Sequence, residues 1–343
     1  MSWMPSSSRS RRQLDRPPRS ARGGLAFSGP PPYHGAVHLT VLSRSTGIFT
    51  TRRIVQAARV RGFRVRVIDP LEVEMELGGA GPALYHRGRP FPRTDVVIPR
   101  IGFSINQYGL AVVNQLQLMG VAVLNGARAI AASRDKMRVL QLLAANGVRV
   151  PHTVMASGPS GLKEMVRLVG GVPVLLKLLS PSEKTGVMVC ETRQALESAL
   201  EAIERLGQNT VVQEYLHDAR GRDIRVLVVG GRVVAALRRR PRVGRLARTL
   251  GQGAHFERLE VRPAFGRAAL DAARVVGLEV CAVDMLEVRG GPRVFEVNSS
   301  PGIREAEEAC GVDVAAAIVD RAAEVLADRT GVADPRADRG ARP

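Results

Sequence analysis

The sequence predicts a parallel α/β domain followed by two α+β lobes. Residues 36–131 alternate short apolar strands with amphipathic helices, a pattern typical of a parallel sheet. In residues 132–212 and 213–330, some apolar strands follow one another directly, as hairpin strands do. A chain of 343 residues, 45% of them hydrophobic, has room for two or three domains.

The first domain shows its alternation segment by segment. Glycine at position 62 ends the first amphipathic stretch, as is common after a helix. Strands are expected at VHLTVL (37–42), FRVRVIDP (63–70), TDVVIPRIG (94–102) and VAVLN (121–125), with helices over 50–62 and 105–119.

The two lobes are predicted from apolar runs separated by helices and by glycine pairs. The first lobe is expected to contain a helix over 134–147, strands within 173–179, 186–191 and 210–216, and a helix over 193–206, with residues 148–156 leading away from the first helix. The second is expected to contain strands over 223–231, 232–240, 279–288 and 292–300, and a helix over 312–328.

Both ends of the chain lack an apolar period. Residues 1–35 are rich in Ser, Pro, Gly and Arg, which predicts a disordered basic tail; an organelle transit peptide and a start codon placed too early are the alternatives. Residues 331–343 are expected to fray. No run of 18 apolar residues occurs, so no transmembrane helix is expected. The partners we predict do not include a membrane. Three well-separated cysteines indicate buried thiols in a reducing, cytoplasmic setting.

The net charge of +18 favours a nucleic acid, a membrane surface or an acidic molecule as partner. Its weight is reduced because 46 of the 50 basic residues are arginine, a ratio that base composition of the genome can produce. Each of the four lysines is therefore more informative: Lys136, Lys163, Lys177 and Lys184.

A predicted hairpin near the C-terminus brings two acidic residues together. Its strands, VCAVDMLEV and RVFEVNSS, are joined across a glycine-containing turn. A hairpin centred on Gly290 places Asp284 opposite Glu296, and Cβ atoms of opposed residues lie ~4.5–5.5 Å apart. Because like charges repel at that distance in apolar surroundings, a bound cation would relieve the strain.

Asn298 lies two residues beyond Glu296 and so shares its strand face, while Phe295 and Val297 are expected on the other. Asp284, Glu296 and Asn298 offer oxygen ligands only, which suits Mg²⁺ or Mn²⁺ rather than zinc. A polar strand face turned to solvent is the alternative interpretation.

Lys177 interrupts the apolar run PVLLKLL, and a buried ammonium is costly without an anion. A phosphate would be a natural partner, whereas an edge-strand lysine that reaches solvent is the alternative. The run VVQEYL ends another apolar strand, whose backbone groups could pair with an adenine edge. Together with the acidic hairpin, these features indicate a nucleotide site between the two lobes.

In this order, VVIPRIG, RDK, PVLLKL, VVQEYL, DIRVLVVG, CAVDML and FEVNSSPG resemble the ATP-grasp superfamily, and within it the RimK-type (ribosomal protein L-glutamate ligase) family. The resemblance covers about residues 37–328. It implies an ATP-grasp fold, with an N-terminal parallel α/β pre-ATP-grasp domain and two α+β lobes that clamp the nucleotide. The implied domains are 36–131, 132–212 (small lobe) and 213–330 (C-terminal lobe with the metal site).

The resemblance also implies roles for individual residues. Lys136 and Lys177 would hold the ATP phosphates, and Asp223 the ribose. The adenine would be lined by Glu214, Tyr215, Leu216 and His217. The metal ligands would be Asp284, Glu296 and Asn298, which would hold one or two Mg²⁺ ions. A substrate carboxylate would attack the γ-phosphate, and an amine would displace phosphate from the resulting acyl phosphate, without a side-chain nucleophile.

Two segments depart from the family pattern. Where members have a glycine-rich loop over the phosphates, this chain has SPSEKTGV (180–187), in which Lys184 offers a compensating charge. Ala247, Arg248 and Thr249 stand where the family typically has Arg-Ser-Asn. Altered rate or acceptor choice is the expected consequence.

The stretch RRRPRVGRLAR (238–248) carries six arginines. It is interpreted either as a solvated loop or as an electropositive channel for an acidic protein or peptide C-terminus, with a ribosomal RNA contact as a further option. The resemblance favours an ATP- and Mg²⁺-dependent carboxylate–amine ligase that adds L-glutamate, or a similar amino acid, and that forms a homo-oligomer. The alternatives are a ligase for a small amino acid or a carrier-protein acceptor, and a non-catalytic nucleotide-binding ribosome- or RNA-associated protein.

Overall fold

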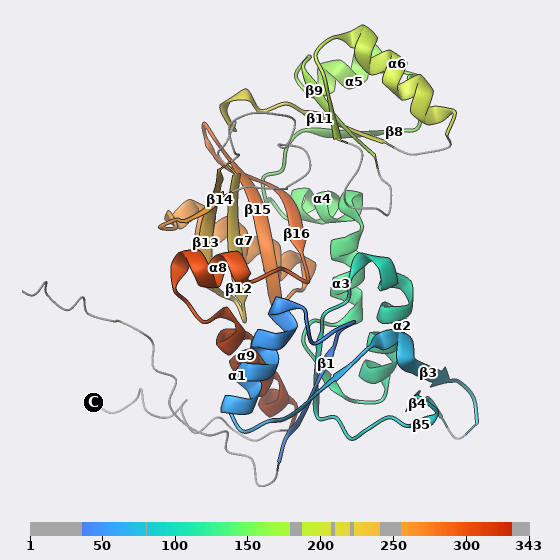
Figure 1. Cartoon of the computed structure of the whole chain (residues 1–343). Helices are drawn as coiled ribbons and strands as arrows, with labels where there is room; N and C mark the ends of the chain where they lie inside the picture. The colour runs from blue at the N-terminus through green and yellow to red at the C-terminus, as the bar shows by residue number, and fades with distance from the viewer. Residues whose placement is uncertain are drawn as a thin grey trace, which may run out of the picture. The chain divides into compact units, whose positions relative to one another are not determined.

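The computed structural model describes residues 36–79, 81–178, 187–206, 210–219, 223–240 and 255–330, which form four sheets with helices packed on them (Figure 1). The predicted tails at 1–35 and 331–343, the loop 180–186 and the segment 241–254 lie outside these residues. None of the helices in the described ranges combines the length and apolarity that a bilayer crossing requires.

The N-terminal sheet is parallel throughout, as the alternation predicts. Its order is β2-β1-β6-β7, with bounds β1 His38–Leu42, β2 Arg64–Ile68, β6 Val96–Pro99 and β7 Ala122–Val123. Its helices are α1 Phe49–Val60, α2 Asn106–Leu118 and α3 Ala127–Arg134. The sequence analysis did not predict α3 or the short helices η1 Pro70–Glu72 and η2 Phe103–Ile105. It also missed a small sheet made of β3 Val73–Glu76, β4 Ala83–His86 and β5 Arg89–Pro90.

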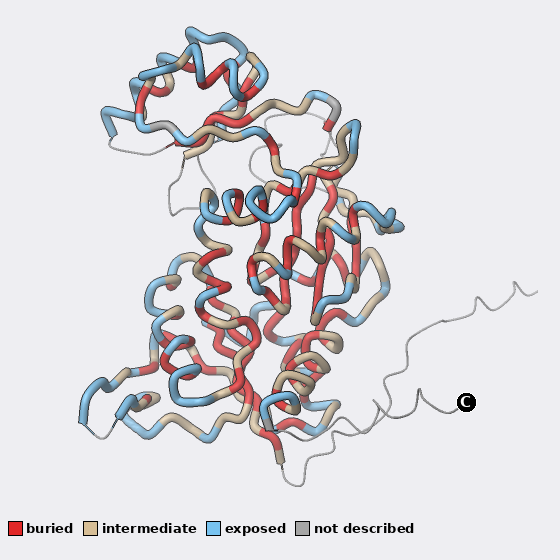
Figure 2. Tube along the Cα trace, turned by 180° about the vertical axis from the view of Figure 1, so that it is seen from behind, coloured by how far each residue is buried: buried red, intermediate tan, exposed pale blue. Residues whose placement is uncertain are grey.

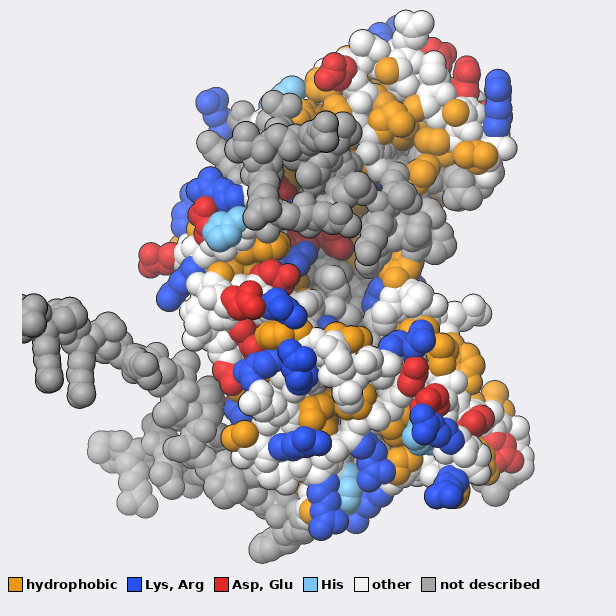
Figure 3. Space-filling model, in the orientation of Figure 1, with side chains coloured by type: hydrophobic (Ala, Val, Ile, Leu, Met, Phe, Trp, Pro, Cys, Tyr) orange, Lys and Arg blue, Asp and Glu red, His pale blue; other side chains and the backbone are white. Residues whose placement is uncertain are grey.

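The next sheet is antiparallel and has its own core. Its order is β10-β9-β11-β8, with bounds β8 Thr153–Ala156, β9 Val174–Leu178, β10 Val187–Cys190 and β11 Thr210–Glu214. Helices α5 Leu162–Leu168 and α6 Arg193–Glu204 accompany it, and η3 His217–Ala219 follows β11. Leu176, Leu196 and Val212 lie at the centre of this core, and each is at most 2% exposed. Hydrophobic side chains also gather on the surface of this lobe (Figure 3).

The third region is a five-stranded antiparallel sheet. Its order is β14-β13-β12-β15-β16, with bounds β12 Asp223–Val229, β13 Arg232–Arg240, β14 His255–Arg258, β15 Val280–Val288 and β16 Gly291–Asn298. The remaining helices are α4 Lys136–Ala145, α7 Pro263–Val276, α8 Arg304–Cys310 and α9 Val314–Thr330. The sequence predicted the long strands, α4 and α9, but neither β14 nor the amphipathic α7 and the short α8.

A continuous apolar core links the parallel sheet to the five-stranded sheet and to α9. Leu39, Ile54, Leu227 and Ile318 belong to one buried cluster, although they come from four separate elements. Figure 2 shows the buried stretches of the chain in red. Buried Asn125 adds polar links, because its Nδ2 donates to Val280 O at 2.7 Å and to Ser299 O at 3.0 Å. Its Oδ1 accepts from Val280 N at 2.9 Å. Asn125, which follows β7, therefore holds the start of β15 and the residue after β16 against the parallel sheet.

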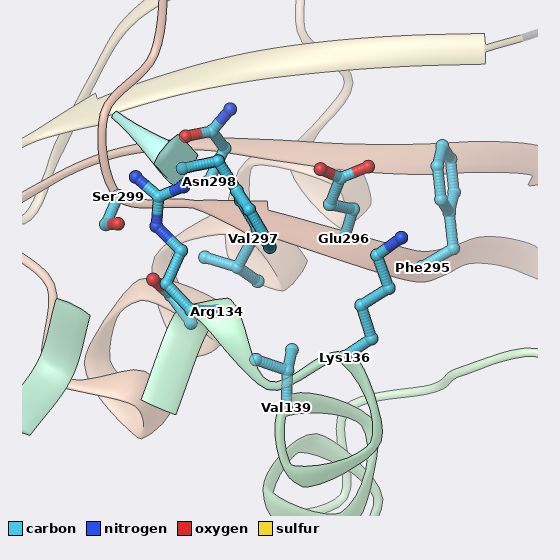
Figure 4. Close-up of a pocket in the computed structure, with 10 residues that line it drawn as sticks. Arg134, Lys136, Val139, Phe295, Glu296, Val297, Asn298 and Ser299 are labelled. Atoms are coloured by element: carbon cyan, nitrogen blue, oxygen red, sulfur yellow. The ribbon is translucent and has the colours of Figure 1, made fainter. Parts of the chain in front are cut away.

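The predicted hairpin forms, but with a different turn and an extra residue. Val288 pairs with Gly291, so the turn is centred between Arg289 and Gly290 rather than on Gly290. Further along β16, Phe295 is an extra residue that forms a bulge. The shifted turn and the bulge change the pairing in opposite directions, so Asp284 faces Glu296 as predicted. The expectation that Phe295 shares a strand face with Val297 is wrong. Because the bulge inserts one residue, Val294 and Val297 share the buried face and Phe295 turns toward the side of Glu296 (Figure 4).

Candidate active site

A pocket lies where the last turn of α3 and the start of α4 face the end of β16 (Figure 4). Figure 4 shows Lys136 reaching toward Glu296 and Arg134 reaching toward Asn298. The residues that line the pocket are Phe103, Ser133, Arg134, Lys136, Val139, Phe295, Glu296, Val297, Asn298 and Ser299. Three predicted site residues, Lys136, Glu296 and Asn298, are therefore brought together here.

The Asp284 carboxylate already has a positively charged neighbour. Arg225 on β12 donates from Nε and Nη2 to its two oxygens, each at 2.8 Å. Asp284, with further contributions from Glu296 and Glu305, raises the pKa of Arg225 above its usual value despite burial. A guanidinium therefore balances the Asp284 charge, a neighbour that the sequence reasoning did not include.

The donor set nevertheless fits Mg²⁺. Asp284 and Glu296 are direct cross-strand partners, and Asn298 extends the row along β16. Arg225 uses one lone pair on each Asp284 oxygen, and a carboxylate has about four acceptor sites. Asn298 Oδ1 accepts from Ser300 N at 2.9 Å, which fixes the side chain at the strand end. Oxygen ligands of this kind are those that a hard cation prefers.

Lys177 extends from β9 into a setting that disfavours its charge. Its Nζ donates to Gln213 Oε1 at 2.7 Å and lies 5.7 Å from the centroid of the Phe295 ring. Burial lowers its pKa to about 8, an effect that Glu296 opposes and Lys136 reinforces. An anion such as a phosphate would stabilise the protonated form. Lys177, Lys136 and Glu296 therefore act on one another electrostatically.

A hydrogen-bonded chain holds Gln213 in place behind Lys177. Gln213 is 2% exposed, and its Nε2 donates to Thr153 Oγ1 at 2.8 Å. Thr153 Oγ1 in turn donates to Pro151 O at 2.8 Å. Because the Gln213 amide nitrogen donates to Thr153, the amide oxygen faces Lys177 and accepts its hydrogen bond.

The predicted adenine segment continues from the same strand. Glu214 Oε1 accepts from His152 N at 2.9 Å, so its carboxylate is engaged beside β8 rather than beside Lys177. The Tyr215 and His217 rings meet edge to face with centroids 4.8 Å apart, and Leu216 between them is half-buried. The Leu216 carbonyl accepts from Ala219 N at 3.0 Å.

Asp223, predicted to contact a ribose, begins β12 and is half-buried. Burial raises its pKa, and nearby Asp284 adds to this effect, while Arg239 at 3.8 Å opposes it. Asp223 therefore belongs to the same electrostatic group as the acidic hairpin.

Four predicted binding residues, Lys184, Ala247, Arg248 and Thr249, lie outside the described residues. The described start of the arginine-rich stretch is paired with acids. Arg238 donates to Glu287 at 2.9 Å and Arg240 to Glu257 at 2.8 Å. Basic and acidic side chains are likewise interspersed on the face in Figure 3. These β13 arginines thus do not support an electropositive channel.

Sequence reasoning missed Arg225, Gln213 and Phe295 as site residues. Arg225 interrupts the apolar run DIRVLVV just as Lys177 interrupts PVLLKLL, so the same signal was present. Gln213 could be found only from the pairing of β11 with β9, which sets it diagonally across from Lys177. Phe295 required knowledge of the bulge.

Comparison with known proteins agrees with this arrangement. Residues 133–322 match the model of the RimK-like ATP-grasp domain, and residues 37–130 match that of the RimK PreATP-grasp domain. A "Probable alpha-L-glutamate ligase" of Halorhodospira halophila is 42% identical over 82% of this chain and 93% of its own length. A protein of the same name from Azotobacter vinelandii is 43% identical over 82% of this chain and 94% of its own length.

Among solved structures, the ATP-grasp ligase PsnB complexed with minimal precursor, Mg and ADP superposes with a TM-score of 0.65. It is 21% identical, over 84% of this chain and 98% of that chain, and supports the ATP-grasp fold. The extent and level of these matches show the family. The chain belongs to the RimK-like ATP-grasp family and is an ATP-dependent ligase.

Proposed function

We propose that this protein uses Mg-ATP to join L-glutamate, or a similar amino acid, to the C-terminal carboxylate of a protein or peptide. The observation that carries the proposal is the convergence of Lys136 and Lys177 with Glu296 and Asn298 at one end of β16. The names of the curated relatives support glutamate as the added amino acid. The precursor, Mg and ADP bound to PsnB support a peptide acceptor and magnesium.

The proposed reaction has two balanced steps. An acceptor carboxylate oxygen attacks the γ-phosphorus of ATP, the bond to the bridging oxygen breaks, and an acyl phosphate and ADP are formed. The amino group of glutamate then attacks the acyl carbon, phosphate leaves with the C–O bond electrons, and the nitrogen loses a proton to give the amide. Activation by phosphorylation explains why no side-chain nucleophile is needed.

Each residue has a place in this scheme. Lys136 and Lys177 would neutralise phosphate oxygens, which makes attack by a negatively charged carboxylate less costly. Asp284, Glu296 and Asn298 would hold one or two Mg²⁺ or Mn²⁺ ions, and a bound ion would supply further neutralising charge. Arg225 would orient the Asp284 carboxylate through its two hydrogen bonds. Residues 214–217 and Asp223 would receive the nucleoside.

We further assign residues 36–131 to the pre-ATP-grasp domain, 132–212 to the small lobe and 213–330 to the C-terminal lobe. A cytoplasmic location, a homo-oligomer and a ribosomal RNA contact stay predictions. The described thiols of Cys190 and Cys281 are buried and free, in keeping with a reducing compartment.

The test is ADP release from the purified protein with Mg-ATP, L-glutamate and a panel of peptides that differ at the C-terminus. We expect glutamate- and peptide-dependent release that falls by about 100-fold or more in Glu296→Ala and Lys177→Ala. Lys163→Ala is the matched control, since Lys163 is an exposed lysine on α5. Release that ignores glutamate, or wild-type protein that does not bind Mg-ATP, would contradict the proposal. RNA binding without ADP release would favour the non-catalytic alternative.

A further inference from the structure

A second group of polar side chains lies at one side of the pocket, near the carboxyl ends of the parallel strands. The chain adds β2 on one side of β1, and then β6 and β7 on the other side, so the order in which strands are added reverses between β1 and β6. Arg100 directly follows β6. Crevices at such reversal points are where open parallel sheets bind ligands. We call Arg100, Arg134, Ser299 and Ser300 the arginine corner.

Arg100 is held by backbone carbonyls rather than by an acid. Its Nη2 donates to Pro301 O at 2.8 Å and to Ser300 O at 3.2 Å. Its Nε is buried and has no hydrogen-bond partner. Burial together with nearby Arg134 lowers its pKa to about 10, and no carboxylate in the described part of the chain is among the groups that shift this pKa. A desolvated guanidinium in this state calls for an anion.

The other members of the corner are also donors. The Ser299 and Ser300 hydroxyls are buried without a hydrogen-bond partner. Arg134 lies with its guanidinium 5.2 Å from the centroid of the Phe103 ring and reaches into the pocket beside Asn298 and Ser299 (Figure 4). Two guanidinium groups and two hydroxyls together form a site for a ligand that offers several acceptor oxygens.

We propose that the arginine corner binds the carboxylates of the incoming amino acid, a ligand class of α-amino dicarboxylates. This inference rests on the function proposed above and deepens it. In that function, the phosphates are assigned to Lys136 and Lys177, on the Phe295–Glu296 side of the pocket. The corner lies on the Asn298–Ser299 side, so a dicarboxylate bound there would have its amino group beside the place where the acyl phosphate forms. Paired guanidinium groups also favour two negative charges over one.

The experiment measures binding by calorimetry in the presence of Mg²⁺ and a non-hydrolysable ATP analogue. The probes are L-glutamate, L-glutamine and glutarate, the last being a dicarboxylate that cannot act as a nucleophile. We expect Arg100→Gln to weaken L-glutamate and glutarate binding by at least about tenfold, since a charge-assisted hydrogen bond is lost. Arg100→Lys should lose less, and L-glutamine should bind the wild type more weakly than L-glutamate does.

Two controls separate the possible causes. Unchanged affinity for the ATP analogue shows that a variant is folded. Arg44→Gln, which removes an exposed arginine paired with Asp69 in the loop after neighbouring β1, should leave L-glutamate and glutarate binding unchanged. Equal glutarate binding by wild type and Arg100→Gln, or no glutarate binding by either, would overturn the inference. A selective loss of ATP-analogue or acceptor-peptide affinity would also overturn it, by assigning the corner to another substrate.

The two proposals can fail separately. If the wild type releases no ADP with glutamate, yet binds glutarate in an Arg100-dependent manner, the dicarboxylate site stands and the proposed reaction does not. If glutamate turnover is normal and Arg100→Gln leaves the KM for glutamate unchanged, the reaction stands and the corner does not.

Discussion

Lys177 and Arg225 occupy comparable positions and are satisfied in opposite ways. Each interrupts a run of apolar residues, Lys177 in β9 and Arg225 in β12. Lys177 donates to the neutral Gln213 amide, and burial lowers its pKa to about 8. Arg225 forms two hydrogen bonds with the Asp284 carboxylate, and its pKa is raised. Among the described residues, Lys177 therefore has no carboxylate hydrogen-bonded to it that would compete with a bound anion, whereas Arg225 already forms an ion pair with Asp284.

This difference matches the tasks assigned to the two sheets. A group that must bind and release a phosphate gains from a neutral partner, because a carboxylate partner would compete with the phosphate. A group that must orient a metal-ligating carboxylate gains from a fixed ion pair. Substitutions of Arg225, Gln213 and Phe295 test this difference, and we expect their effects to decrease in that order.

Removal of the Arg225 charge should have the largest effect on stability. Arg225→Met leaves the Asp284 carboxylate, in a residue only 8% exposed, without its partner. Breaking a buried ion pair in this way costs about 3–5 kcal/mol, and we expect the lower end because the Arg225 side chain is 29% exposed. Chemical denaturation without divalent cations measures the loss in the free energy of unfolding.

Added Mg²⁺ sharpens this test. If the ion binds the acidic hairpin, it should recover more stability in Arg225→Met than in the wild type, because it replaces the missing positive charge. Arg232→Met is the matched control, since it removes a β13 arginine whose ion pair with Glu324 is mostly exposed and is worth about 0–1 kcal/mol. Equal losses in the two variants would show that Asp284 does not depend on Arg225.

The pH dependence of nucleotide binding should report on Lys177. Since its pKa is lowered to about 8, the charged form is present below that pH and is lost as the pH rises through it. Between pH 7 and pH 9 the protonated fraction of the free protein falls from about 90% to about 10%. We expect the affinity for a non-hydrolysable ATP analogue to fall by up to about tenfold over this range, as measured by calorimetry.

Gln213→Glu provides the control for this assignment. A carboxylate in place of the amide would give Lys177 the kind of partner that Arg225 has. The pKa of Lys177 should then rise, the decline in affinity should move to higher pH, and binding at pH 7 should weaken. A pH profile that is the same in wild type and Gln213→Glu would mean that another group controls it.

The same pair of strand cations shows how far the sequence could predict this molecule. Lys177, Asp284 and Glu296 stood out because charges in apolar runs and a glycine turn are local signals. The pairing of Arg225 with Asp284 depends on the contact between β12 and β15, which are separated by about 50 residues of chain, so no local pattern encodes it. The parallel order of the first sheet followed from its alternation, whereas short elements such as β14 and α8 offered too few residues to show a period.

The bulge at Phe295 is the part of the site that only the structure reveals, and it gives the smallest expected effect. The inserted residue turns an aromatic ring to within 5.7 Å of the Lys177 ammonium. A cation–π contact of this kind stabilises the charged form by about 0.5–1 kcal/mol, or roughly half a pKa unit. Phe295→Leu should therefore move the decline in ATP-analogue affinity to lower pH by about half a unit, the direction opposite to that of Gln213→Glu. Phe49→Leu removes a ring near Arg52 and Arg304 instead, and should not move the decline. If both phenylalanine variants retain the wild-type profile, the Phe295 ring does not stabilise the lysine charge, and the bulge matters only because it restores the pairing of Asp284 with Glu296.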